Sequence, residues 1–311
     1  MLLLGHAATA LAGGRIVVVA DDTTTSRQVH QLLSVELRAT GLFEAPASAI
    51  GLTQKSGGEG AATNSVAAAA SAVQVDVAVA VGASALRQLL QQATPKQIIV
   101  VLITRSALDE ELARLPAKSG REIHAIVLDQ PLGRYLDLMR LAFPQRQRVG
   151  LLLGPGGVPQ QKSLERLASE REMSVSVAHV NEDVVFIPQL ERLLTQCDVL
   201  LALPDTSVPN RNTVQPLLLT TYRAGVPVVA YSEAYAQAGA LLALYSTPAQ
   251  LARQTAEVVH SLTLGRNAPV IQGPRYFSVS VNGSVARSLG LTLPPGDVLR
   301  DRLQQGAAAT E

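Results

Sequence analysis

Short apolar runs alternate with amphipathic stretches along nearly the whole chain. The runs are rich in Val, Ile and Leu, and most of them show no alternation of apolar and polar residues. Strands that are buried on both faces have this composition, and they occur in parallel sheets whose connecting helices cover both sides. We therefore predict an α/β fold built on doubly wound parallel sheets.

The pattern predicts both the strands and several of the helices between them. Leucines fall on one face of residues 160–172 and of residues 188–196, which indicates two sheet-covering helices. The region before the second strand has little periodicity; it predicts a flexible loop at 56–64 and a helix at 64–73. The predicted strands are Arg15–Ala20, Val75–Val81, Gln97–Thr104, Ile123–Leu128, Arg148–Leu153, Ser174–Val180, Val199–Leu203 and Val226–Ala230.

The length of the chain favours two domains. At 311 residues it exceeds the size at which a single core usually stops growing. The alternating pattern also falls into two similar series, 15–128 and 148–244, which the polar segment Pro144–Arg148 separates. Two lobes of similar build are expected.

Charge and composition exclude several classes of function. The chain has 26 Lys and Arg against 25 Asp and Glu, so no long-range field attracts nucleic acid. One cysteine and five scattered histidines lack the spacing of a metal site. Dinucleotide, Walker, nucleophile-elbow and zinc-protease motifs do not occur in the sequence. We expect no catalytic set, no bound metal and no cofactor.

The first fourteen residues form an apolar stretch that ends in Ala10-Leu11-Ala12 before Gly13. This small-x-small arrangement is typical of a signal-peptidase site, although a basic n-region does not precede it. We interpret residues 1–14 as the remnant of a signal peptide and expect a periplasmic protein. An apolar tail on a protein that is not exported is the alternative.

Polar side chains follow most of the predicted strands. In open parallel sheets, ligands bind outside the carboxyl ends of the strands. The same residue types also cap helix N-termini, so each position taken alone has a purely structural interpretation. The candidate ligand-binding residues are Asp21, Thr23, Ser84, Thr104, Asp129, Gln130, Asp205, Thr206, Tyr231, Ser232 and Glu233.

A family resemblance extends this interpretation. Residues 199–266 contain a strand, a polar loop, a helix that ends in Arg223-Ala224-Gly225, a further strand and then Ala238-Gly239-Ala240. Gly265 closes a long helix, and the tail runs from Val281-Asn282 to Leu289-Gly290-Leu291. This order resembles the bacterial ABC-transporter substrate-binding proteins, a family that includes tryptophan- and tyrosine-binding members.

The resemblance implies a type I periplasmic-binding fold, in which two doubly wound lobes are joined by three crossovers and trap a ligand between them. We expect the crossovers near residues 127, 244 and 269. The first lobe would hold 15–127 and 245–268, including a helix from Tyr245 to Leu264, and the second 128–244 and 269–305. Residues 306–311 would form a disordered tail.

The resemblance also implies a function and partners. The protein would bind a small polar or amino-acid-like solute, lie peripheral to the membrane and deliver the solute to ABC permease subunits. A ligand-sensing module for a membrane receptor is a second hypothesis. A cytoplasmic α/β enzyme that uses Asp21, Asp22 and Asp205 is a third.

Overall fold

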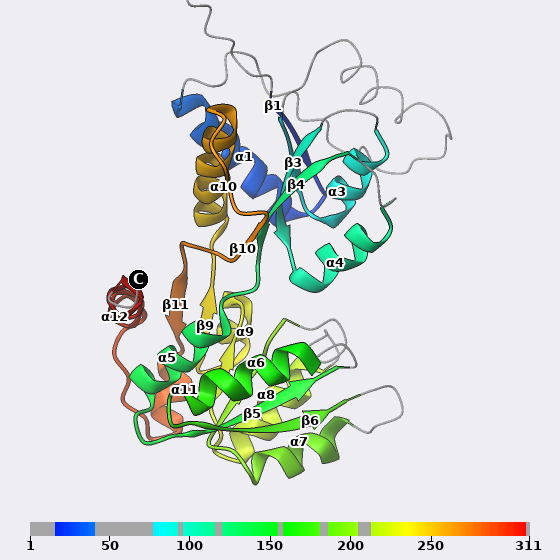
Figure 1. Ribbon diagram of the computed structural model, residues 1–311. Coiled ribbons are helices and arrows are strands. Elements are labelled where there is room, and N and C mark those ends of the chain that lie inside the picture. Colours follow the sequence, from blue (N-terminus) through cyan, green and yellow to red (C-terminus); the bar gives the residue numbers. More distant parts are fainter. Residues whose placement is uncertain are drawn as a thin grey trace, which may run out of the picture. The chain divides into compact units, whose positions relative to one another are not determined.

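The computed structural model describes residues 16–40, 77–92, 96–115, 120–154, 158–180, 186–204 and 213–308. The chain divides into two compact units (Figure 1). Unit 1 comprises Met1–Val127 and Pro248–Gln272, and unit 2 comprises Leu128–Thr247 and Gly273–Glu311. The chain therefore passes from one unit to the other three times, after Val127, after Thr247 and after Gln272.

Unit 1 is built on a parallel sheet with the strand order β1-β2-β3-β4-β10. Its strands are β1 (Ile16–Ala20), β2 (Val77–Val81), β3 (Gln97–Ile103), β4 (Glu122–Val127) and β10 (Ile271–Gln272). Its helices are α1 (Thr24–Ala39), α3 (Ala83–Leu90), α4 (Arg105–Ala113) and α10 (Pro248–Thr263). All the paired strands run in the same direction, so their carboxyl ends meet at one edge of the sheet.

Helices cover both faces of this sheet. Helices α1 and α10 lie side by side on one face, and α3 and α4 cover the other (Figure 1). All five residues of β2 are buried, as a strand without alternation requires. On the α3 side, Leu86 and Leu89 of α3 pack with Leu108 of α4 over Ala78 and Val100.

Unit 2 is built on a second, mixed sheet with the order β11-β9-β8-β7-β5-β6, in which β11 runs antiparallel to β9 and the other pairs are parallel. Its strands are β5 (Arg148–Leu153), β6 (Ser174–His179), β7 (Val199–Leu201), β8 (Val228–Ala230), β9 (Leu242–Tyr245) and β11 (Ser278–Val281). Its helices are α5 (Leu132–Ala142), α6 (Val158–Ser169), α7 (Phe186–Leu194), α8 (Val214–Arg223), α9 (Glu233–Ala238), α11 (Gly283–Ser288) and α12 (Gly296–Ala308).

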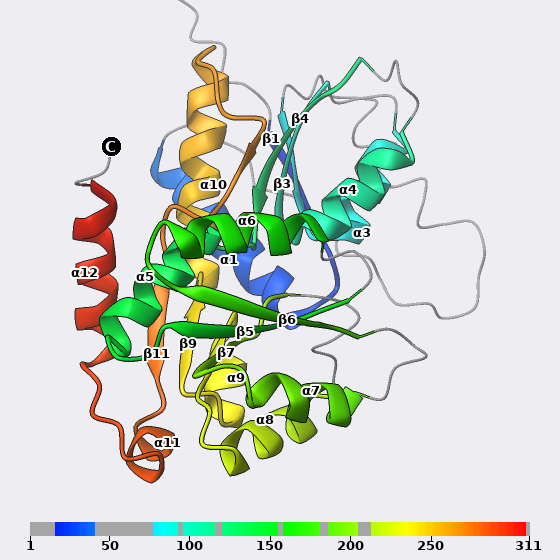
Figure 2. The ribbon, with the colours of Figure 1, turned by 60° about the horizontal axis from the view of Figure 1, so that its bottom comes forward.

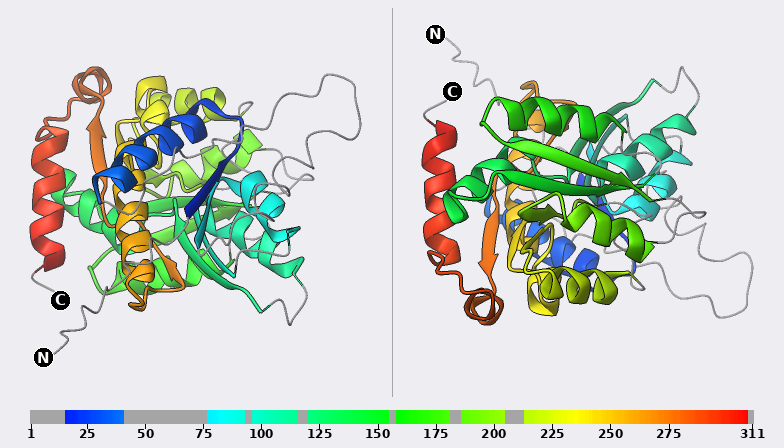
Figure 3. Two further views of the ribbon diagram at one scale, coloured as in Figure 1. Left: turned by 90° about the horizontal axis from the view of Figure 1, so that it is seen from above. Right: turned by 90° about the horizontal axis from the view of Figure 1, so that it is seen from below.

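Two apolar clusters hold unit 2 together, one on each face of its sheet. Figure 2 shows α5 and α6 on one side of β5 and β6, and α7 and α8 on the other. The first cluster joins Leu136 and Met139 of α5 to Leu164 of α6 and to the strands. Helix α12 packs beside β11 and α5 and adds Leu299 to the same cluster (Figure 3). The second cluster packs α7, α8 and α9 against the opposite face.

The predicted α/β fold with parallel sheets is confirmed, and each of the eight predicted strands is present with its ends shifted by two residues at most. The helix from Tyr245 to Leu264 was predicted wrongly at its start: Tyr245 ends β9, and α10 begins at Pro248, because proline suits a first helical turn. The predicted tail is also corrected at residues 306–308, since α12 continues to Ala308.

Three further predictions lie outside the described residues: the leader at 1–14, the loop at 56–64 and the helix at 64–73. Within the part of the chain that the structure describes, no helix is both long and apolar enough to span a bilayer.

A bulge interrupts the end of β3. The register with β4 shifts between Val101 and Ile103, and the intervening Leu102 has a φ of 60°, a left-handed conformation that is uncommon for a leucine. Bulges redirect a strand and re-aim the side chains that follow it. This bulge sits directly before Thr104, one of the predicted site residues.

Candidate functional site

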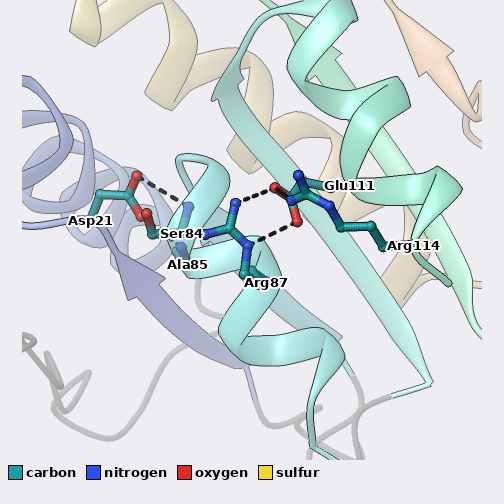
Figure 4. Close-up of polar contacts among 6 residues, drawn as sticks. All are labelled: Asp21, Ser84, Ala85, Arg87, Glu111 and Arg114. Carbon is teal, nitrogen blue, oxygen red and sulfur yellow. Dashed lines mark hydrogen bonds and ion pairs between the residues drawn. The ribbon is translucent and has the colours of Figure 1, made fainter.

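In unit 1, the structure uses Asp21 to cap a neighbouring helix. Asp21 follows β1, and its carboxylate accepts hydrogen bonds from the backbone N–H of Ala85 at 2.6 Å and of Ser84 at 3.4 Å (Figure 4). These amides belong to the first turn of α3, which has no partner of its own for them. The contact brings Asp21 and Ser84 together across 63 residues of sequence.

The other two predicted residues of unit 1 also cap helices. The Thr23 hydroxyl accepts from the backbone N–H of Ser26 at 3.1 Å at the start of α1. The Thr104 hydroxyl accepts from the backbone N–H of Ala107 at 3.3 Å at the start of α4. Asp22 forms an exposed ion pair with Arg27. The helix-capping interpretation therefore holds for Asp21, Thr23 and Thr104, and a ligand role for them stays a prediction.

Close to the Asp21 cap, the buried carboxylate of Glu111 binds two arginines (Figure 4). Glu111 of α4 is only 4% exposed and binds Arg87 of α3 through both of its oxygens and Arg114 at 2.6 Å. The hydrogen bond from Arg87 is the largest cause that lowers the pKa of Glu111, against the opposing effect of desolvation. The ionised carboxylate of Glu111 thus links α4 to α3, which is the helix that Asp21 caps.

This clamp makes unit 1 sensitive to acid. Because the pKa of Glu111 is lower in the folded than in the unfolded chain, its contribution to stability is full above the unfolded value of about 4.3. That contribution is lost as the pH falls through the lowered folded pKa. We expect Glu111→Gln to be less stable than the parent at neutral pH and to lose less stability on acidification, as measured by urea unfolding from pH 7 to about pH 3.

Glu110→Gln is the matched control, because Glu110 precedes Glu111 on the same helix and is exposed. It should unfold with the acid dependence of the parent. If the parent and Glu111→Gln lose the same stability on acidification, the ion pairs of Glu111 are not the cause of the acid sensitivity.

In unit 2, Gln130 lies in a polar network at the points where the chain enters and leaves the unit. Its side chain is buried, donates to the Ser246 hydroxyl at 3.0 Å and accepts from Nη1 of Arg134 at 2.6 Å. Ser246 in turn donates to the backbone carbonyl of Tyr276 at 2.7 Å, and Arg134 donates to that of Pro274 at 2.9 Å. The network therefore ties together the three segments of unit 2 that adjoin unit 1 in sequence.

The polar residues after β8, Tyr231, Ser232 and Glu233, differ in what they contact. Ser232 caps α9 by accepting from the backbone N–H of Tyr235 at 3.4 Å, while the Tyr231 ring packs 5.3 Å from the Tyr235 ring. Glu233 is exposed at the first position of α9. Desolvation raises the pKa of Tyr245 at the end of β9, and the charge of Glu233 raises it further. Tyr245 bonds the Ser280 hydroxyl at 3.0 Å.

Buried Tyr135 of α5 connects these two groups. Its pKa is raised, chiefly by desolvation and further by the charges of Asp129 and Tyr231, whereas Arg134 opposes the shift. Asp129, Tyr231 and Arg134 therefore all lie near this one side chain. The carboxyl edge of the unit 2 sheet gathers the predicted residues Asp129, Gln130, Tyr231, Ser232 and Glu233.

Two predicted residues, Asp205 and Thr206, lie outside the described residues. In the described part of the chain, no three His, Cys, Asp or Glu side chains gather in a way that could hold a metal ion. These residues of unit 2 can offer hydrogen bonds, carboxylates and aromatic surface to a small molecule.

Sequence reasoning missed Arg134, Ser246 and Tyr245, which complete the polar edge of unit 2. Arg134 could have been found, because it follows Gln130 by four residues and such pairs share one face of a helical turn. Ser246 and Tyr245 had no comparable signal, since both were predicted as the start of a helix.

Comparison with known proteins matches this architecture to one family. Residues 52–300 match the family model of ABC transporter substrate binding proteins. No curated protein matches the chain in sequence.

Three solved structures share the fold over most of their length. The ligand-free, open structure of CD0873, a substrate binding protein with adhesive properties from Clostridium difficile, has a TM-score of 0.66 and 15% identity, and the match covers 90% of this chain and 96% of that one. The ABC domain in complex with L-Trp from Streptococcus pneumonia has a TM-score of 0.56 and 14% identity over 90% and 96%. A conserved domain protein from Vibrio cholerae has a TM-score of 0.59 and 19% identity over 93% and 98%.

At these identities the solved structures establish the fold alone, and the family model, which spans well over half of the chain, establishes the family. The two doubly wound units and their three connections agree with it. The chain belongs to the ABC transporter substrate-binding protein family.

Proposed function

We propose that the protein binds a small polar or amino-acid-like solute outside the cytoplasm, through the strand-end loops of its two units, and delivers it to an ABC permease. The observation that carries the proposal is the polar edge of unit 2, where Gln130, Arg134, Tyr231 and Glu233 gather around Tyr135 and Tyr245. The apolar leader at 1–14 supports export.

Family membership also decides against an enzyme. Members of this family bind substrates and are not enzymes. The residues of the enzyme hypothesis have structural roles where they are described, since Asp21 caps α3 and Asp22 pairs with Arg27. The protein is a binding protein.

The remaining proposed ligand contacts are Asp21, Thr23, Ser84 and Thr104 on unit 1, Asp129 and Ser232 on unit 2, and Asp205 and Thr206. A helix-capping hydroxyl keeps a lone pair free after it accepts one amide, so capping and ligand binding are compatible. A solute that engages the loops of both units favours the closed state, and binding should then lower the radius of gyration in small-angle scattering.

Glu233 offers the sharpest test of this assignment. It is exposed, so Glu233→Gln removes the negative charge with little effect on the fold. If the carboxylate binds a charged donor of the solute, the substitution should weaken binding by about 1.5 to 3 kcal/mol, measured by titration calorimetry with the solute that a screen of amino acids, peptides, sugars and nucleosides identifies.

Gln237→Ala is the control, because Gln237 is exposed on the same helix one turn further on. It should bind like the parent. Unchanged affinity in Glu233→Gln, or an equal loss in both variants, would remove Glu233 from the site.

A further inference from the structure

Two glutamines are buried in the described part of the chain, and both lie beside connections between the units. Gln130 is 5% exposed and follows the first connection, and Gln254 is 1% exposed and follows the second. Glutamine side chains are mostly exposed, because a buried polar atom without a hydrogen-bond partner costs about 1 to 3 kcal/mol. The burial of these two amides at the connections therefore points to a role in holding them.

In unit 2, Gln130 joins the ends of all three connections. Its amide nitrogen donates to Ser246, which comes just before the second connection, and Ser246 donates to the carbonyl of Tyr276, which comes after the third. Its amide oxygen accepts from Arg134, which also donates to the carbonyl of Pro274. We call Gln130, Ser246 and Arg134 the unit 2 node.

In unit 1, a pair of glutamines joins the second connection to the third. Nε2 of Gln254 on α10 donates to Oε1 of Gln272 at 3.1 Å. Gln272 ends β10 and comes directly before the third connection. Nε2 of Gln272 is buried without a partner, so its oxygen is the atom that holds this side chain in place. We call Gln254 and Gln272 the unit 1 node.

Strand pairing adds the first connection to the unit 1 node. Strand β10 pairs with β4, in the register that sets Gln272 beside Ile126, and β4 ends at the buried Val127. The next residue after β10 is Gly273, where a Cβ would lie 3.5 Å from the carbonyl oxygen of Asp129. The first and third connections therefore run side by side from the end of the β4–β10 pair.

We propose that the two nodes confine bending between the units to residues 128–129, 247 and 273, which are the residues left between the fastened ends. Each node is buried and links segments that are distant in sequence, so each keeps its own ends of the connections in one arrangement. Hinges of this kind consist of a few residues that absorb the change in φ and ψ. A node that opens lengthens the stretch that can bend, and the units then sample more arrangements. The inference goes beyond the proposed function, because it concerns the protein without solute.

The test measures distances between the units of the solute-free protein by electron spin resonance. Spin labels are placed at Glu110→Cys on α4 and Gln237→Cys on α9, two exposed positions, with the buried Cys197 replaced by alanine. Ser246→Ala opens the unit 2 node, and Gln254→Ala opens the unit 1 node. We expect each substitution to broaden the distribution of label distances, and the two together to broaden it further.

Ser288→Ala and Gln31→Ala are the matched controls, one in each unit. Ser288 is exposed and its hydroxyl donates within its own helical turn, and Gln31 is exposed on α1. Both controls should keep the distribution of the parent. If Gln254→Ala does not fold, Gln254→Met replaces it, because methionine keeps the volume and lacks the donor.

Hydrogen exchange identifies the end that has loosened. Ser246→Ala should speed exchange at the end of the β9–β11 ladder, where Tyr245 pairs with Ser278, by about tenfold, the effect of losing about 1.4 kcal/mol of local stability. It should leave the amide of Ala125, which bonds the chain just before β10, as in the parent. Gln254→Ala should have the reverse effect. An unchanged distance distribution in either variant, equal broadening in the controls, or faster exchange spread over both units would overturn the proposal.

Discussion

Gly82→Ala is expected to destabilise unit 1 by about 2 to 4 kcal/mol. Gly82 has a φ of 107° and a ψ of 168°, a region that is essentially restricted to glycine and costs other residues about 1 to 3 kcal/mol. A Cβ at this position would lie 2.2 Å from Oδ2 of Asp21. The carboxylate would have to leave the amides of Ser84 and Ala85, and the loss of a helix cap costs about 0.5 to 2 kcal/mol more. Urea unfolding of the parent and the variant measures the difference.

Gly120→Ala is the matched control, because Gly120 has a φ of 62° in unit 1 but a Cβ there would meet nothing within 4 Å. It should cost about 1 to 2 kcal/mol from the backbone alone. In an Asp21→Ala background, the clash disappears and the cost of Gly82→Ala should fall toward that of the control. Equal costs for the two glycines in the parent background would contradict the capping role of Asp21.

A cognate solute is expected to stabilise the protein by about 2.7 kcal/mol when it is present at about 100 times its Kd. A solute that binds only the native state shifts the unfolding equilibrium by mass action, whatever the contacts that hold it. The gain in unfolding free energy should grow as the logarithm of one plus the ratio of the solute concentration to its Kd. Thermal unfolding against amino acids, short peptides, sugars and nucleosides measures it, and a solute that binds in calorimetry without raising the unfolding temperature would contradict it.

The sequence was sufficient for most of the fold because buried parallel strands leave a strong local signal. The run of β2 is apolar at every position, and the structure buries all of it. The segments at 160–172 and 188–196 show the helical period, and α6 and α7 occupy them with ends shifted by two or three residues. These elements are specified by their own residues.

The elements near the connections between the units could not be predicted in the same way. Strand β10 has only two residues, Ile271 and Gln272, and forms because β4 is available beside it. Strand β9 has four residues and was not predicted, and its last residue, Tyr245, was assigned to the helix that follows, although Pro248 marks the boundary. In both cases the tertiary partner, rather than local propensity, decides the structure.

The candidate site could be predicted only in part, since the residues that cap helices are the residues that bind ligands. Thr23, Thr104 and Ser232 follow strands as the pattern requires, and all three cap the helix that comes next. Contacts between distant segments leave no local signal. Glu111 meets Arg87 from 24 residues away, and Gln130 meets Ser246 from 116 residues away.

The most direct test of the central claim is to recover the solute after it has been bound. The isotope-labelled solute from the unfolding screen would be equilibrated with the protein by dialysis, released by denaturation and identified by mass spectrometry. A binding protein of this family should retain the solute at saturable occupancy and return it chemically unchanged after long incubation. Recovery of a chemically altered solute, in an amount that grows with time and with protein concentration, would contradict the account.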